Sequence, residues 1–128
     1  MEYAEVYGVR GAAYLDLGNL DLAIEDFDKA INIDPNNFLS ICGLCYIYYY
    51  RAEYTPAIAY FNKAIELNPD AALLYYLRGN AYYEQNKYDC AIEDFDKAID
   101  LEPDYIDAFD SRDMAYQAKN KEVIEEKS

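Results

Sequence analysis

Cys42 and Cys45 are spaced as a C-x-x-C motif, the arrangement in this chain with the clearest potential for redox or metal chemistry. Thioredoxin-like chemistry needs this motif at a helix start that follows a strand, and a zinc site needs a second cysteine pair or histidines. The sequence has no histidine, and its third cysteine, Cys90, stands alone. Because Cys42 and Cys45 also fall inside a predicted helix, we interpret both as packing residues and expect no metal site.

Carboxylates form two groups that could support acid-base catalysis or hold a divalent ion. They occupy equivalent places in two predicted helices: Glu25, Asp26 and Asp28, and Glu93, Asp94 and Asp96. On the exposed face of a straight helix, solvation keeps carboxyl pKa values near normal, and oxygen ligands do not converge on one ion. The chain also lacks a glycine-rich phosphate loop. The sequence therefore predicts a protein that is not an enzyme and that binds no cofactor.

The elements that position these residues come from a repeat of 34 residues. The segment 23–35 returns at 57–69 and at 91–103 with few changes. Each copy places alanine, phenylalanine, alanine and isoleucine at i, i+4, i+7 and i+8, which is one face of a helix. A fixed period of this size indicates a repeat array, in which each unit buries its apolar face against a neighbour. We predict no strands, first helices at 4–17, 38–51, 72–85 and 106–119, and second helices at 21–33, 55–67 and 89–101.

The predicted helix boundaries repeat as well. Residues suited to an N-cap precede the second helices: Asp21, Thr55 and Asp89. Pro56 then takes the first helical position after Thr55, where its missing N–H has no cost. Residues that tolerate left-handed backbone should end the first helices: Gly18, Asn86 and Asn120. Prolines should stop the second helices: Pro35, Pro69 and Pro103.

The composition sets the broad class of the protein. With 128 residues, 53% apolar content and no apolar run long enough to cross a bilayer, the chain is predicted to be one folded domain. A net charge of -14 disfavours nucleic acid and membranes as partners and favours basic ones, although an acidic surface that serves solubility alone is our first interpretation. The N-terminus lacks signal-peptide features and the cysteines are odd in number, so we expect a cytoplasmic location.

The repeat resembles the tetratricopeptide repeat family, whose 34-residue helix-turn-helix unit has small residues at positions 8, 20 and 27, tyrosine at 11, an aromatic residue at 24 and proline at 32. Counted from Ala4, the first repeat matches at Gly11, Tyr14, Ala23, Phe27, Ala30 and Pro35. The second matches at Cys45, Tyr48, Ala57, Phe61, Ala64 and Pro69, and the third at Gly79, Tyr82, Ala91, Phe95, Ala98 and Pro103. The chain departs from the family where arginine replaces the usual leucine, at Arg10, Arg78 and Arg112.

The resemblance implies an all-α fold, an α-solenoid of helix-turn-helix repeats that forms a right-handed superhelix with a C-terminal capping helix. The predicted organisation is a single repeat domain over 1–128, with repeats at 4–37, 38–71 and 72–105. Residues 106–128 form a partial fourth repeat, or capping helix, and a tail, because position 20 of that unit is Glu125 where the family has a small residue. The tail is predicted to be either a frayed helix or the beginning of a further repeat.

In the family, the first helices line a concave groove that binds peptides. The residues of this chain at those positions that we predict to bind a peptide are Leu39, Cys42, Tyr46, Tyr49, Tyr50, Leu73, Tyr76, Leu77, Asn80 and Tyr83. Tyrosine suits such a groove because it offers a rigid apolar surface with a hydrogen-bonding tip. One variant of the family grips a terminal carboxylate with lysine, asparagine and arginine. The matching positions here are Gly8, Ala12, Gly43, Leu73 and Leu77, so that clamp is absent.

The leading hypothesis is a protein-protein interaction scaffold that binds a peptide or helix of a partner protein in a tyrosine-rich groove, without catalysis. The partner is expected to be basic or apolar. The alternative is a self-assembly module that stacks through exposed repeat ends, which implies weak self-association. Light scattering at varied concentration would distinguish the two hypotheses.

Overall fold

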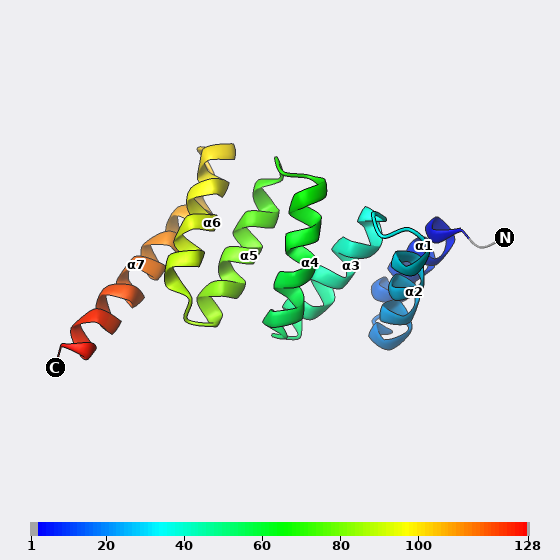
Figure 1. The fold of residues 1–128 in the computed structure, drawn as a ribbon, viewed down its shortest axis with the longest axis horizontal. Coiled ribbons are helices and arrows are strands. Elements are labelled where there is room, and N and C mark those ends of the chain that lie inside the picture. The colour runs from blue at the N-terminus through cyan, green and yellow to red at the C-terminus, as the bar shows by residue number, and fades with distance from the viewer. Residues whose placement is uncertain (1–2, 128) are drawn as a thin grey trace. The chain divides into compact units, whose positions relative to one another are not determined.

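The computed structural model describes residues 3–127, and over that range the chain forms seven helices and no strand (Figure 1). The helices are α1 Ala4–Asp16, α2 Leu20–Ile33, α3 Phe38–Tyr50, α4 Tyr54–Leu67, α5 Ala72–Glu84, α6 Tyr88–Leu101 and α7 Ile106–Glu126. They belong to two compact units, residues 1–67 and residues 68–128. The predicted all-α helical-repeat fold is confirmed. None of the described helices is both long and apolar enough to cross a membrane.

The same backbone turn closes the first helix of each repeat. At its tip the chain enters the left-handed region, at Gly18 (φ 78°), Ala52 (φ 59°) and Asn86 (φ 62°). The following residue donates its N–H to the carbonyl of the tyrosine at position 11, at 2.9 Å in all three repeats. This bond satisfies a carbonyl that the last turn of the helix would otherwise leave unpaired. Gly18 and Asn86 therefore end their helices as predicted.

The second helices begin earlier than predicted. Asn19 is the N-cap of α2, and its side-chain oxygen accepts the N–H of Leu22 at 3.3 Å. Lys87 precedes α6 without a side-chain cap, and α4 begins at Tyr54. The N-caps predicted from the sequence, Asp21, Thr55 and Asp89, are wrong because all three lie within the first turn of their helices. Pro56 is likewise the third residue of α4 rather than the first, still within the turn whose N–H groups need no helical partner.

The last helix is longer than predicted. Instead of ending near Asn120, α7 continues to Glu126, and only Ser128 of the predicted tail lies outside the described residues. In the other repeats, a second helix packs its alanine and phenylalanine stripe back on the first helix and fixes the turn between them. After Asn120 that stripe is missing, and the lysine and glutamate residues that follow favour continued helix.

Each unit has its core where a second helix packs on the next first helix. In unit 1 the fully buried cluster joins α2 to α3: Ala23, Phe27, Leu44 and Ile47. In unit 2 the equivalent cluster joins α6 to α7: Ala91, Ile92, Phe95 and Ala115. A Cβ added to Gly11 would lie 2.8 Å from the Phe27 ring, and one added to Gly43 would overlap that ring. Glycine at these positions therefore lets the phenylalanine approach the backbone of both first helices.

Ion pairs between a partly exposed arginine and a buried aspartate join the first and second helices of the first and third repeats. The guanidinium of Arg10 donates two hydrogen bonds to Asp26, both of 2.7 Å, and that of Arg78 donates two to Asp94, of 2.8 and 2.6 Å. Asp26 is 3% exposed and Asp94 4%. The prediction of solvated carboxylates is wrong for these two, because a residue 16 positions after an arginine faces it across the helical hairpin. Arg112, the third unusual arginine, pairs with Asp96 at 2.8 Å.

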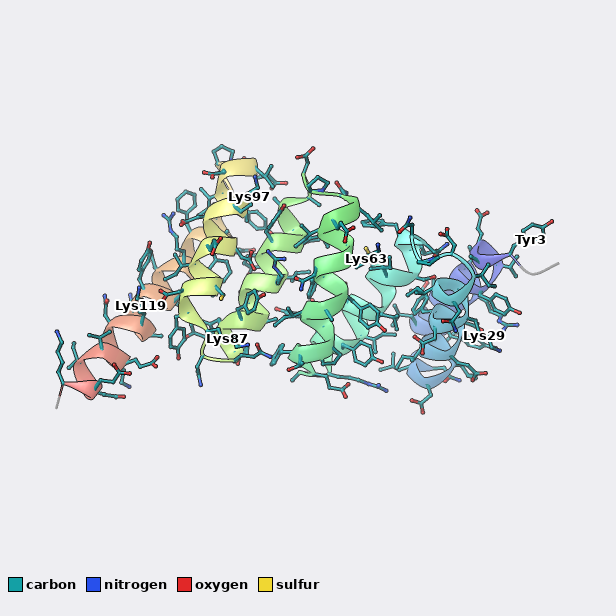
Figure 2. All side chains as sticks on the ribbon, in the orientation of Figure 1. Tyr3, Lys29, Lys63, Lys87, Lys97 and Lys119 are labelled. Carbon is teal, nitrogen blue, oxygen red and sulfur yellow. The ribbon has the colours of Figure 1, made fainter. Side chains whose placement is uncertain are left out.

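Near the Arg10 and Arg78 ion pairs, lysines of the second helices also lie over tyrosine rings of the first helices. Lys29, Lys63 and Lys97 hold the same position in α2, α4 and α6 (Figure 2). The ammonium of Lys29 lies 5.6 Å from the centre of the Tyr7 ring, and that of Lys97 lies 6.0 Å from the Tyr75 ring. The middle repeat has isoleucine instead of this tyrosine and leucine instead of the arginine. At these two positions the middle repeat is therefore stabilised by apolar packing, whereas the first and third repeats have an arginine that pairs with an aspartate.

Candidate functional site

Three tyrosines of α3 come together on unit 1. Tyr46, Tyr49 and Tyr50, which we call the α3 tyrosine cluster, share a helix face because they are three and four residues apart. The ring centroid of Tyr50 lies 4.5 Å from that of Tyr46 and 5.0 Å from that of Tyr49. Tyr46 is 53% exposed and Tyr50 is 65% exposed. The cluster is therefore an aromatic surface that is already ordered by its own ring contacts and open to a partner.

Tyr49 anchors this cluster to the core of unit 1. Its ring meets the edges of Tyr54 and Phe61, each with a centroid distance of 6.1 Å. Because Phe61 is fully buried, Tyr49 contributes to packing as well as to the surface. Of the predicted residues in the cluster, Tyr46 and Tyr50 are consequently the ones that can be changed with the least effect on the fold.

Two other predicted residues of unit 1, Leu39 and Cys42, differ in exposure. Leu39 is an exposed apolar residue in the first turn of α3. Cys42 is half-buried, and burial raises the pKa of its thiol. Burial also raises the pKa of the Cys45 thiol, and the neighbouring Cys42 raises it further. Both thiols are thus disfavoured as thiolates, which supports the interpretation of the C-x-x-C motif as packing rather than redox chemistry.

The predicted residues of unit 2 are less exposed. Leu73 is exposed, whereas Tyr76, Leu77, Asn80 and Tyr83 are half-buried. Tyr76 packs against Phe95 at 6.1 Å and against Tyr105 at 5.1 Å between ring centroids, so part of its surface is already used within the unit. Burial next to Tyr76 raises the pKa of Tyr105 to about 12. Tyr76 therefore resembles a core residue more than a free binding residue.

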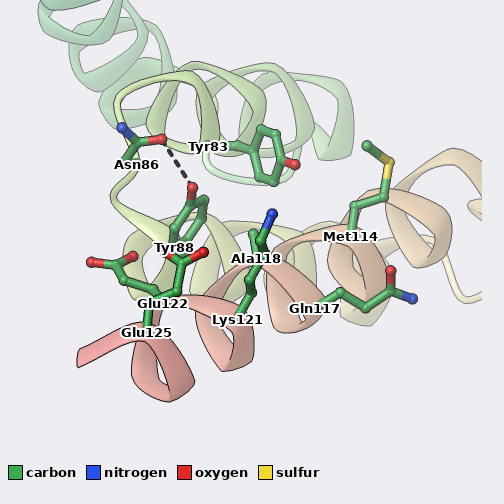
Figure 3. A pocket seen from close by; sticks show the side chains of 9 residues that line it. All are labelled: Tyr83, Asn86, Tyr88, Met114, Gln117, Ala118, Lys121, Glu122 and Glu125. Atoms are coloured by element: carbon green, nitrogen blue, oxygen red, sulfur yellow. Dashed lines mark hydrogen bonds between the residues drawn. The ribbon is translucent and has the colours of Figure 1, made fainter. Parts of the chain in front are cut away.

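A pocket of about 600 Å³ opens in unit 2 where α7 passes the turn between α5 and α6 (Figure 3). We call it the α5–α7 pocket, and its lining residues are Tyr83, Asn86, Tyr88, Met114, Gln117, Ala118, Lys121, Glu122 and Glu125. The rings of Tyr83 and Tyr88 meet edge to face with centroids 5.5 Å apart. The hydroxyl of Tyr88 donates to the side-chain oxygen of Asn86 at 2.9 Å, which fixes its orientation.

Sequence reasoning identified only Tyr83 among the residues of this pocket. Met114, Gln117 and Ala118 were missed, although they hold positions 9, 12 and 13 of the fourth unit, which are groove positions in the earlier repeats. The groove positions could have been extended to that unit because Tyr116 and Phe109 already mark its first helix. Lys121 and the two glutamates have no such signal, since they lie in the part of α7 that was expected to be a tail.

The positions that correspond to a carboxylate clamp cannot act as one. Gly8 and Gly43 are buried, and a side chain at Gly43 would overlap the ring of Phe27. A side chain at Gly8 would come within 2.9 Å of the Ser40 hydroxyl oxygen. Within residues 3–127, no group of three His, Cys, Asp or Glu side chains is placed to hold a metal ion.

Comparison with known proteins gives consistent results. Two models of the tetratricopeptide repeat match the chain, over residues 4–37 and over residues 45–106. RNA polymerase II-associated protein 3 of Xenopus laevis is 51% identical over 37 residues, which are 29% of this chain and only 6% of that protein.

Solved structures extend the likeness to nearly the whole chain. The first TPR domain of human RPAP3 has a TM-score of 0.77 at 26% identity, covering 92% of this chain and 93% of that one. The first TPR of Spaghetti (RPAP3), solved with the HSP90 peptide SRMEEVD, has a TM-score of 0.81 at 26% identity, covering 91% and 93%. A crystal structure of MamA has a TM-score of 0.84 at 31% identity, covering 91% and 68%.

Proposed function

Because this chain belongs to the tetratricopeptide repeat family, a family of non-catalytic protein-interaction modules, we propose that it binds a peptide or helix of a partner protein through the tyrosines of its first helices. The α3 tyrosine cluster is the observation that carries the proposal. Its rings are ordered by mutual contact, and Tyr46 and Tyr50 remain more than half exposed. Exposed apolar groups of this kind are typical of interaction sites.

The partner is proposed to be basic or apolar. The net charge of -14 attracts basic segments and repels acidic ones, most strongly at low salt. A relative binds SRMEEVD, a peptide with an acidic end. In this chain, by contrast, the clamp positions have no side chain that could donate to a carboxylate, and two of them are buried glycines. These features support a partner of different chemistry from the acidic tail that this relative holds.

Self-association is the second candidate, and the outer face of α1 favours it. Val6 and Val9 are exposed on α1, whereas Ser40 and Gly43, at the same positions of the next repeat, are buried. An equivalent helix from a second molecule could cover that face. Light scattering over a range of concentrations tests self-association, and a constant monomer mass would exclude it.

We also propose a cytoplasmic location, in keeping with the three free cysteines.

The test of peptide binding compares two exposed sites of unit 1. A peptide selected from a display library is titrated into the protein, into a Tyr46→Ala/Tyr50→Ala variant and into Tyr3→Ala. Tyr3 is the matched control because it is 58% exposed and precedes α1, outside the cluster. Each tyrosine of the cluster should contribute about 1–2 kcal/mol, so the double variant should lose at least about 30-fold in affinity. Equal affinities for the double variant and for the parent protein would refute the proposal.

A further inference from the structure

We propose that the α5–α7 pocket receives the cationic side chain of a lysine in the partner peptide. This inference rests on the proposed function and specifies one contact of it. The lining of the pocket combines two aromatic rings, a thioether and two carboxylates. Its volume of about 600 Å³ is in the range of small-ligand pockets, roughly 300–1,000 Å³, so a side chain and its flanking backbone fit within it.

The aromatic part of the pocket is suited to a cation. The rings of Tyr83 and Tyr88 are inclined at 61°, so together they form a corner that can receive an ammonium group (Figure 3). The face of an aromatic ring attracts a cation through its quadrupole. The hydrogen bond from Tyr88 to Asn86 keeps one wall of this corner in place without a partner. The corner is therefore organised before a ligand arrives, which reduces the entropy cost of binding.

The charge around the corner has the sign that a lysine requires. Glu122 and Glu125 line the pocket from α7, one turn apart. Desolvation is the largest cause of the raised pKa of Tyr88, and Tyr83 and Glu122, which also line the pocket, raise it further. An ammonium group in the pocket would thus lie among aromatic rings and carboxylates. A carboxylate in the same place would be repelled by Glu122 and Glu125.

Lys121 shows how the pocket accommodates such a group. This side chain extends from α7 toward the rings of Tyr83 and Tyr88 (Figure 3). The protein thus supplies a cation of its own to the pocket, and because Lys121 is exposed it can swing into solvent when a partner lysine enters. Removal of Lys121 should therefore strengthen binding of a lysine peptide. If the pocket instead held a carboxylate, Lys121 would be its ligand, and removal would weaken binding.

The experiment uses the isotopically labelled full chain and three capped heptapeptides of alanine and leucine with lysine, norleucine or glutamate at the centre. The resonances of the Met114 methyl group and of the Tyr83 and Tyr88 rings report binding in the pocket, and those of Tyr46 and Tyr50 report the α3 tyrosine cluster. The lysine peptide should shift the pocket resonances and bind about tenfold more tightly than the norleucine peptide. The variants are Lys121→Met, Glu122→Gln/Glu125→Gln and the control Asp110→Asn, which removes an exposed charge of α7 outside the pocket.

We expect Lys121→Met to tighten the lysine peptide about threefold to tenfold, the double glutamine variant to weaken it at least about tenfold, and Asp110→Asn to change it less than about twofold. Weaker lysine binding by Lys121→Met together with preference for the glutamate peptide would overturn the inference in favour of an anion site. Equal affinities for lysine and norleucine peptides, or shifts confined to the α3 tyrosine cluster, would also overturn it but leave the proposed function standing. Absence of shifts at both places with every peptide would overturn both.

Discussion

The second helices and the first helices of this protein use the same repeat in opposite ways. The second helices present one stripe three times, with each member 0–1% exposed: Ala23, Phe27 and Ala30, then Ala57, Phe61 and Ala64, then Ala91, Phe95 and Ala98. On the first helices, position 9 is Ala12, Tyr46 and then Asn80, and none of the three is fully buried. The repeated stripe therefore maintains the fold, and the varied positions can differ because packing constrains them less.

The largest expected effect comes from breaking the stripe. Phe27→Ala should destabilise the protein by about 3–5 kcal/mol, because the ring fills the space above two helical glycines that cannot close the cavity. That loss approaches the whole stability of a small domain, which is about 5–15 kcal/mol. Urea unfolding followed by circular dichroism measures it. A loss below about 1 kcal/mol would show that the stripe is not what holds the repeat together.

Gly43→Ala tests whether some first-helix positions are as constrained as the stripe. The added methyl group would overlap the Phe27 ring, and overpacking of this kind costs about 1–3 kcal/mol. Intrinsic helix propensity acts in the opposite direction, by about 1 kcal/mol in favour of alanine. We therefore expect a net loss of stability in thermal unfolding. A rise in Tm would mean that Phe27 can move aside and that this groove position is open to variation.

The ion pair of the first repeat links the two kinds of helix and should give a pH-dependent stability. The hydrogen bonds from Arg10 hold the pKa of Asp26 below its ordinary value. Because the folded-state pKa is the lower one, the stabilisation is complete above the unfolded-state pKa of about 4 and is lost as the pH falls through the folded-state pKa. Asp26→Asn should cost about 1–2 kcal/mol at neutral pH and have less effect in acid.

Urea unfolding of the parent protein and of the Asp26→Asn variant, at about pH 7 and at about pH 3, measures how the stability lost in this variant depends on pH. Asp21→Asn is the matched control, since Asp21 is an exposed residue of the same helix. If the Asp26→Asn variant lost stability in acid as steeply as the parent protein, the ion pair of Arg10 and Asp26 would not be the source of the pH dependence.

Ser40 gives the smallest expected change in stability, and one of opposite sign. Its side chain is fully buried at the start of α3, and its hydroxyl oxygen has no hydrogen-bond partner among the described residues. Replacing a buried unpaired hydroxyl with a methyl group removes a desolvation cost, so Ser40→Ala should stabilise the protein by about 1 kcal/mol. Thermal unfolding should show a higher Tm, and a lower one would mean that the hydroxyl finds a partner.

Much of this architecture follows from the sequence because the repeat makes the local signals consistent. The 34-residue period, the turn residues Gly18 and Asn86 and the prolines together located six of the seven helices to within a residue or two. The end of α7 could not be found in the same way, because Asn120 has the right residue type but no second helix packs back to enforce a turn. Local propensity then decided the outcome.

The candidate site was less predictable for a different reason. Residue type alone placed Asp26 and Asp94 in solvent, whereas the arginine facing each across its hairpin buries both. The same limit applies to Tyr76, which packs on Phe95 and Tyr105, and to the α5–α7 pocket, whose glutamates lie on an unexpected extension of α7. Contacts between elements, rather than the elements themselves, are what the pattern of a single sequence leaves open.

The central claim is that the fold and the binding surface are separable, and one measurement tests it most directly. A selected peptide is titrated into the labelled chain while the aromatic resonances of Tyr46 and Tyr50 and of Phe27, Phe61 and Phe95 are followed together. We predict saturable shifts at the two exposed tyrosines and no comparable shifts at the three buried phenylalanines. Shifts concentrated on the outward faces of α2 and α6, with Tyr46 and Tyr50 unchanged, would contradict it.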